Sequence, residues 1–309
     1  MIQVEHLTRR YGDLLAVDDV SFRIDHGEVV GLLGHNGAGK TTIMKMMTGF
    51  LEPTSGSIRI DDLTIGRDTR AIQARIGYLP ENCPLYPEMT VIDYLDYQAG
   101  LHGVAEDQRP SAIARALQRT VLAEKATHPI QTLSRGYRQR VGVAQSILHQ
   151  PDIVILDEPT NGLDPTQILQ MRELIGELAR TATVIVSTHI LQEVQAVCDR
   201  VLILRTGQLV VDSRLDALQQ GQRLLVRVDD EAAELLAGVE GVGGVEARGR
   251  ANGRWTYALD ADDEAAPRIA TALGAAGRRL YALHPEHRDL ETVFAEANEI
   301  APTGEVAHA

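Results

Sequence analysis

The chain has 309 residues, and its 30 Lys and Arg against 43 Asp and Glu give a formal net charge of −13. This acidic balance disfavours a general nucleic-acid binder, because neutralising phosphates requires a basic surface. Hydrophobic residues make up 44% of the chain and charged residues 24%, ordinary values that argue against wholesale disorder.

The cysteines and the apolar runs bear on the compartment. Cys83 and Cys198 lie far apart, which favours neither a disulfide framework nor a zinc site. No apolar run reaches the ~18 residues needed to span a bilayer, and the first residues lack an apolar signal region. We therefore expect a cytosolic chain that would reach a membrane only through a partner.

Residues 1–212 show alternating strand and helix signals. Several of the β-rich runs are apolar without alternation, as in strands buried on both faces of a sheet. This predicts an α/β domain with a largely parallel central sheet. Residues 86–150 carry helix signals alone, with Thr90 as a candidate N-cap, and predict a helical insertion. The runs read as strands are 27–33, 57–60, 75–79, 153–157, 183–187 and 201–204.

The segment 34–42, GHNGAGKTT, matches the phosphate-loop pattern between a predicted strand and a predicted helix. Its glycines let backbone N–H groups turn inward, and the helix start adds the positive end of its dipole. Lys40 can place its charge on the β- and γ-phosphates, Thr41 can hold Mg²⁺, and Thr42 can reach the α-phosphate. The chain has only three lysines, which makes a chance match rarer. The predicted nucleotide-binding residues are Gly34, Asn36, Gly37, Ala38, Gly39, Lys40, Thr41 and Thr42.

Two acidic residues, Asp157 and Glu158, stand at the carboxyl end of the apolar strand 153–157, in the sequence IVILDE. They would lie beside the phosphate loop if the two strands are neighbours. Asp157 is suited to hold Mg²⁺ through water, and Glu158 is suited to polarise the attacking water as a general base. Together with the phosphate loop, they predict a nucleotide hydrolase.

Two more segments, LSRGYRQRVGVAQ at 133–145 and STH at 187–189, complete a series with GHNGAGKTT, ILDEP and NGLDP. In this order the motifs resemble those of the ATP-binding subunits of ABC transporters, over residues 1–212. The resemblance implies a P-loop NTPase fold and the cofactors ATP and Mg²⁺. It also implies a head-to-tail dimer of two such subunits that encloses two ATP molecules.

The resemblance also assigns roles to single residues. Tyr11 matches the aromatic residue that stacks on adenine. Ser134 and Gly136 match the signature residues that reach the γ-phosphate across the dimer, and a serine at a helix start is a physically suitable anion site. Asp164 belongs to the loop, 162–164, that crosses the dimer interface. His189 matches the histidine that contacts the γ-phosphate and positions the water.

The chain departs from the commoner family pattern in two places. Arg135 and Tyr137 stand in the signature, where L-S-G-G-Q is more usual. Glu81 stands where glutamine is usual. A carboxylate can ligate Mg²⁺ but cannot donate a hydrogen bond to water. We still expect Glu81 at the γ-phosphate, as a catalytic residue and metal ligand, and at the surface that couples to a membrane subunit. Both departures resemble a branch with gliding-motility-type and drug- or antibiotic-export-type ATPases.

The chain after residue 212 predicts a linker, 213–222, and a small α+β accessory domain, 223–309. Its strand and helix signals follow a β-α-β-β-α-β order, which fits a ferredoxin-like unit. No metal cluster or nucleophile stands out there. We therefore expect an appendage, with a regulatory ligand-binding unit as the alternative.

The leading hypothesis is the ATP-hydrolysing subunit of a transporter, driving a separate integral-membrane permease, in the direction of export. Such a subunit would be peripheral on the inner face of the cell membrane. The alternative is a non-transport ABC ATPase that regulates a cell-envelope or gliding complex. A P-loop kinase or GTPase is disfavoured, because it would need neither the signature segment nor His189.

Overall fold

The computed structural model describes residues 1–219, 223–261, 263–285 and 290–299. Its contacts divide the chain into two compact units, the first formed by Met1–Arg214 together with the described residues 297–299 and the second by Leu215–Glu296. None of the helices in the described residues is both long and apolar enough to cross a membrane.

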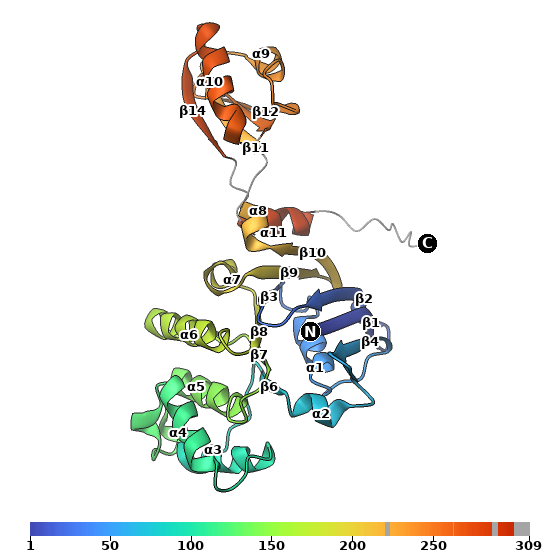
Figure 1. The fold of residues 1–309 in the computed structure, drawn as a ribbon, viewed down its shortest axis with the longest axis vertical. Helices are drawn as coiled ribbons and strands as arrows, with labels where there is room; N and C mark the ends of the chain where they lie inside the picture. The colour runs from blue at the N-terminus through green and yellow to red at the C-terminus, as the bar shows by residue number, and fades with distance from the viewer. Residues whose placement is uncertain (220–222, 262, 286–289, 300–309) are drawn as a thin grey trace. The chain divides into compact units, whose positions relative to one another are not determined.

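A six-stranded sheet is the centre of the first unit, with strand order β10-β9-β3-β8-β7-β6 (Figure 1). All neighbouring pairs are parallel except β10 with β9, which confirms the predicted parallel sheet. β3 and β7 are not neighbours, because β8 lies between them. The strands are β3 (Val29–Leu33), β6 (Ile76–Leu79), β7 (Ile153–Asp157), β8 (Thr183–Thr188), β9 (Arg200–Arg205) and β10 (Gln208–Arg214).

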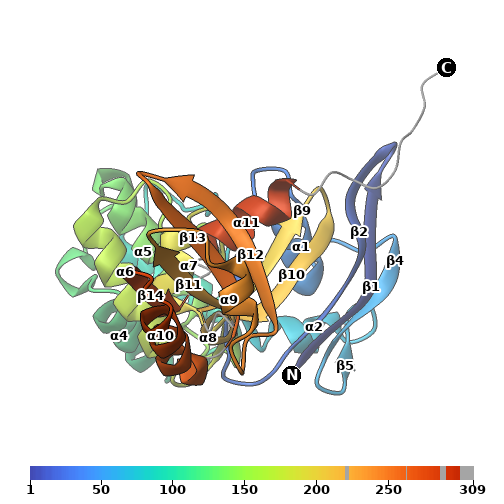
Figure 2. The ribbon, with the colours of Figure 1, turned by 90° about the horizontal axis from the view of Figure 1, so that it is seen from above.

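A second, antiparallel sheet in this unit has the order β2-β1-β4-β5. It lies on the opposite side of the central sheet from the helices α4 and α5 (Figures 1 and 2). Three of its strands, β1, β2 and β5, are absent from the predicted runs, and β4 overlaps the run 57–60. The strands are β1 (Ile2–Tyr11), β2 (Leu14–Ile24), β4 (Ser55–Ile60) and β5 (Leu63–Thr64).

The helices between the strands include the predicted insertion. Thr90 caps α3 by accepting a hydrogen bond from the Asp93 N–H, as the sequence predicted. The helices of the first unit are α1 (Lys40–Met47), α2 (Thr69–Gln73), α3 (Val91–Leu101), α4 (Arg109–Arg119), α5 (Arg135–Ser146), α6 (Pro165–Leu178) and α7 (Leu191–Val197), with the 3₁₀ turns Ala123–Lys125 and Ile130–Thr132.

Two hydrophobic cores cover the two faces of the central sheet. Along β7, Val154 and Leu156 pack into the core that contains α3–α6. Ile153 and Ile155 pack into the core that contains α1 and the antiparallel sheet. Side chains alternate across a strand, so a run that is apolar at every position is buried on both faces. This explains why the sequence of β7 shows no alternation.

The second unit contains an antiparallel sheet of order β12-β13-β11-β14. The unit β11-α9-β12 has β13 between its two strands, and the unit β13-α10-β14 has β11 between its two strands. Two β-α-β units that interleave in this way form the predicted ferredoxin-like fold. Leu236 of α9 and Ile269 of α10 pack in one core with the sheet. The elements are α8 (Leu215–Gln219), β11 (Arg223–Val228), α9 (Ala233–Ala237), β12 (Gly244–Ala251), β13 (Arg254–Asp260), the 3₁₀ turn Asp263–Ala265, α10 (Ala266–Ala275), β14 (Leu280–Pro285) and α11 (Leu290–Glu299).

Candidate nucleotide-binding and hydrolytic site

The phosphate loop connects β3 to α1, and its glycines are required by its geometry. Gly37 and Gly39 have φ values of 85° and 105°, in the region that favours glycine. A β-carbon on Gly34 would lie 2.6 Å from the Leu204 carbonyl oxygen. Gly39, the N-cap of α1, has no side chain to cap the helix, and the first turn carries no acidic residue. The helix start therefore presents its N–H groups and its dipole to an anion.

Lys40 lies at the first position of α1 and is 6% exposed. Its Nζ donates hydrogen bonds to the carbonyl oxygens of Gly34 at 2.7 Å and His35 at 3.3 Å. It also lies 3.7 Å from Oε1 of Glu158. The loop thus folds around the ammonium group and holds it inside the site. Thr41 and Thr42 follow on the helix and are partly exposed.

Asp157 ends β7 and is fully buried. Its Oδ1 accepts a hydrogen bond of 2.5 Å from the Ser187 hydroxyl on the neighbouring strand β8. Its Oδ2 is buried with no hydrogen-bond partner. A buried carboxylate oxygen without a donor is costly unless another group satisfies it. Mg²⁺ takes one or two protein oxygens plus phosphate oxygens, so Asp157 with Thr41 fits such an ion.

Glu158 follows Asp157 with a φ of 48°, a conformation that is uncommon for a residue with a side chain. Its Oε2 accepts a 2.9 Å hydrogen bond from Nδ1 of His189, while its Oε1 faces Lys40. Burial raises the pKa of Glu158, and the charges of His189 and Lys40 partly oppose this. Lys40 and His189 thus both contact the carboxylate of Glu158. This contact forms although β8 lies between β3, which leads into the phosphate loop, and β7, which leads to Glu158.

The tyrosine predicted to stack on adenine, Tyr11, lines a groove of about 990 Å³ together with Lys45 of α1. Tyr11 ends β1 and is 43% exposed, with the Arg9 guanidinium 4.6 Å from its ring centroid. The hairpin that carries it packs on the phosphate loop, because a β-carbon on Gly39 would lie 2.7 Å from the Ala16 carbonyl oxygen. The guanidinium of Arg9 thus covers one face of the Tyr11 ring.

The signature residues and the loop before α6 form a second cluster. Ser134 caps α5 by accepting a hydrogen bond from the Tyr137 N–H, as predicted. Asp164 caps α6 in a reciprocal capping box with Gln167. Within the described residues, no hydrogen bond or ion pair joins Ser134, Gly136 or Asp164 to Lys40 or Glu158. The single chain thus carries two clusters of predicted residues.

Glu81 follows β6 at the edge of the central sheet and is exposed. Among the described residues, no hydrogen bond or ion pair joins it to Lys40, Asp157 or Glu158. It lies in the loop between Pro80 and Pro84, which borders the groove of about 990 Å³ that Tyr11 lines. Phe50 and Leu101, which are 70% and 65% exposed, also line this groove.

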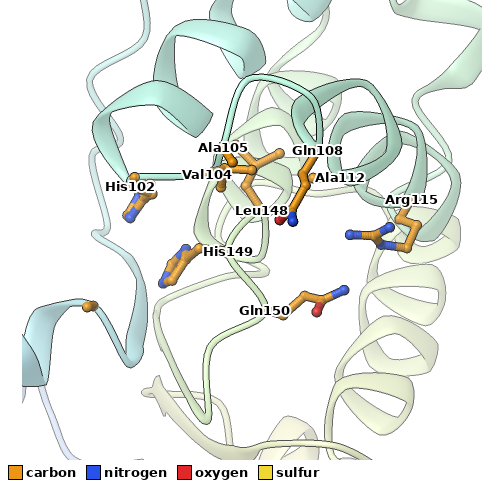
Figure 3. Close-up of a pocket in the computed structure, with 11 residues that line it drawn as sticks. His102, Val104, Ala105, Gln108, Ala112, Arg115, Leu148, His149 and Gln150 are labelled. Carbon is orange, nitrogen blue, oxygen red and sulfur yellow. The ribbon is translucent and has the colours of Figure 1, made fainter.

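A smaller cavity, of about 310 Å³, is separate from the phosphate loop. The rings of His102 and His149 stack in it with centroids 4.1 Å apart, and Figure 3 shows them on the opposite side of the cavity from Arg115. Burial lowers the pKa of His149 to about 4. None of the predicted site residues lines this cavity in the described part of the chain.

Two residues of these clusters escaped the sequence prediction. Ser187, which donates to Asp157, lies in the STH segment two residues before His189. Its place at the end of a strand beside β7 was the available signal. Gln167 stands three residues after Asp164, and this D-x-x-Q spacing is a capping-box signature.

Comparison with known proteins agrees with this geometry. A family model described as ABC transporter matches residues 17–161. The bacitracin transport ATP-binding protein BcrA of Bacillus licheniformis is 36% identical over 225 residues, which cover 72% of each chain. The solved structure of cbiO1 from Clostridium perfringens, part of the ABC transporter complex cbiONQ, is 29% identical with a TM-score of 0.63 and covers 69% of this chain and 88% of cbiO1.

The dimeric structure of MJ0796, described as a bacterial ABC transporter cassette, is 25% identical with a TM-score of 0.65. It covers 70% of this chain and 99% of MJ0796. The family model covers the region that contains the phosphate loop and Glu158. The chain therefore belongs to the family of ABC transporter ATP-binding proteins.

Proposed function

We propose that this chain binds and hydrolyses ATP and drives a separate integral-membrane permease, in the direction of export. The observation that carries the proposal is the buried Glu158 carboxylate between Lys40 and His189. A cation, a base and a histidine meet at the mouth of a phosphate loop, which suits hydrolysis of a terminal phosphate.

The chemistry follows from the tautomer and the burial. Because the Glu158 carboxylate can only accept, the Nδ1 of His189 carries a hydrogen. The Nε2 is then left to accept a hydrogen bond from the water, since only a ring with hydrogens on both nitrogens could also donate to the γ-phosphate. The raised pKa of Glu158 makes it a stronger base toward a water proton. Lys40 stabilises the phosphate charge. A Mg²⁺ held by Asp157 and Thr41 would neutralise charge on the phosphate oxygens.

Two copies of the chain are expected to work together. In the described part of the chain, no hydrogen bond or ion pair joins Ser134, Gly136 or Asp164 to Lys40. An arrangement in which each copy completes the other's site requires this separation. A relative, MJ0796, has been solved as a dimer. We infer a head-to-tail dimer with an ATP between the phosphate loop of one copy and the helix start of α5 in the other.

The hydrolytic part is tested with Glu158→Gln, which keeps the shape of the side chain and removes the base. We expect ATP turnover to fall by about a hundredfold or more, and ATP to drive the variant into a stable dimer in sedimentation experiments. Glu173→Gln, an exposed glutamate of α6, is the matched control and should hydrolyse ATP like the native chain. Normal hydrolysis in Glu158→Gln would refute the role of Glu158.

The groove beside Glu81 also contains Tyr11, so we assign to the permease only the part of it that Phe50 and Leu101 line. Phe50 and Leu101 expose large apolar side chains there, and such a patch costs free energy unless it is covered. The relative cbiO1 is part of a transporter complex, and BcrA is named for bacitracin transport. The loop that carries Glu81 also borders the groove. A permease segment bound in the groove would therefore contact this loop, which directly follows β6 of the central sheet. This would hold the chain on the cytoplasmic face of the membrane.

The partner is tested by isolating the tagged chain from native membranes in detergent. We expect one integral-membrane protein to co-purify, and Phe50→Asp to release it. Leu169→Asp, at an apolar residue of α6 that is 58% exposed, is the control that should retain it. If both variants retain the membrane protein equally, the interface does not include Phe50. If the protein that co-purifies is a regulatory protein with a single membrane span, the alternative of a non-transport ATPase is favoured.

A further inference from the structure

The start of α5 and the loop before α6 touch through a reciprocal pair of contacts. A β-carbon placed on Gly162 would lie 2.5 Å from Cζ and 2.7 Å from both Nε and Nη1 of Arg135. Because three guanidinium atoms are almost equally near, the flat face of the guanidinium lies on Gly162. Gly162 has a φ of 73°, so both its backbone and its surroundings exclude a side chain.

The second contact has the same form in the opposite direction. A β-carbon on Gly136 would lie 2.5 Å from both Cδ and Nε2 of Gln167, so the flat side-chain amide covers Gly136. The orientation of this amide is fixed, since Gln167 belongs to the capping box with Asp164. Each segment therefore provides one glycine and one planar polar side chain, and each planar group lies on the other segment's glycine.

We propose that Arg135 and Gln167 form a clasp that makes the signature, 134–136, and the loop 161–164 move as one body. Arg135 is a positioning residue in this assignment, because it acts through Gly162. The inference rests on the proposed function, in which both segments face the ATP held by the other copy. A clasp formed before the copies meet would preset the surface that closes on that nucleotide.

Substitutions of Arg135 can distinguish a packing role of its flat guanidinium from a role of its charge. Arginine is a planar cation, glutamine is planar and neutral, and lysine is a cation without a planar group. If the flat face matters, Arg135→Gln should keep most of the clasp, whereas Arg135→Lys and Arg135→Ala should lose it. Arg138→Ala removes an exposed arginine three residues further along α5 and is the matched control.

The clasp itself is tested in the nucleotide-free chain by amide hydrogen exchange. The Leu163 N–H donates to the Thr160 carbonyl at 3.1 Å and reports on the loop. We expect Arg135→Ala and Arg135→Lys to speed its exchange by about tenfold, and Arg135→Gln by about threefold or less. Unchanged exchange in Arg135→Ala would overturn the clasp. If Arg135→Lys keeps the protection of the Leu163 N–H and Arg135→Gln loses it, the planar contact is overturned.

The consequence is tested in the Glu158→Gln background by sedimentation with ATP. Arg135→Ala should weaken the ATP-dependent dimer by about tenfold, while the affinity of the monomer for a fluorescent ATP analogue stays unchanged, because Lys40 is untouched. A general loss of stability would instead weaken both the dimer and the affinity of the monomer for the ATP analogue. Full dimerisation of Arg135→Ala would overturn the positioning role. If Glu158→Gln does not dimerise at all while the exchange result holds, the proposed function fails and the clasp stands.

Discussion

The two units of the chain use their charged side chains differently. Every buried polar or charged side chain of the described residues belongs to the first unit, including Lys40, Asp157 and Glu158. In the second unit, Arg223 pairs with Asp260 and Glu246 at the surface. Burying an ionisable group costs free energy that a stable fold avoids. The unit that tolerates this cost is the one with the phosphate loop, so burial of charge distinguishes that unit from the second one.

The largest effect should come from the cation of the first unit. Lys40→Ala removes the ammonium group that the loop surrounds, and we expect the affinity for ATP to fall by about a hundredfold or more. Isothermal titration measures this directly. Lys45→Ala, on the last turn of the same helix, is the control and should bind ATP normally. Retained affinity in Lys40→Ala would contradict the assignment of the loop.

The buried carboxylate should set the acid limb of the pH–rate profile. Because the pKa of Glu158 is raised by burial, the base is protonated at a higher pH than an ordinary glutamate. Turnover should therefore be complete above the raised pKa and fall about tenfold for each pH unit below it. ATP affinity measured over the same range is the control. A limb centred at or below the ordinary value of 4.5 would contradict the raised pKa.

Stability should follow the same division between the units. Arg140 is 7% exposed and donates to Gln170 and to the Thr120 carbonyl, so Arg140→Ala should lower the free energy of unfolding by about 3 kcal/mol. Arg223→Ala breaks half-exposed ion pairs and should cost about 1 kcal/mol or less.

The chain's one tryptophan, Trp255, lies in the second unit and separates the two transitions. In a denaturant titration, Arg140→Ala should shift the circular dichroism transition of the helices and leave the Trp255 fluorescence transition in place. Arg223→Ala should shift the fluorescence transition alone. Equal shifts of both signals in either variant would mean that the units do not unfold independently.

The smallest effect is expected from removing the appendage. Deleting residues 221–309 should leave ATP affinity within about twofold of that of the full chain, because a unit with its own core folds by itself. The measurement is again titration with ATP, after circular dichroism has shown that the truncated chain is folded. A folded truncation that no longer binds ATP would show that the second unit contributes to the site.

The local parts of the fold and site were predictable. The strand–loop–helix at 34–42, the caps at Thr90 and Ser134, and the β-α-β-β-α-β order of the second unit depend on residue types a few positions apart. β1 and β2 were missed because their pairing is irregular, with register shifts between Val4 and Leu7 and between Leu7 and Arg9. Bulges of this kind break the alternation from which a strand is predicted.

The sequence by itself determined the phosphate loop, the acidic pair after an apolar strand and the helix starts, since spacing and capping act within one or two turns of chain. Only the tertiary structure decided that β8 lies between β3 and β7 and still lets Lys40, Glu158 and His189 meet. It alone placed Arg135 on Gly162. Such contacts depend on which surfaces are buried together, and no local spacing specifies that.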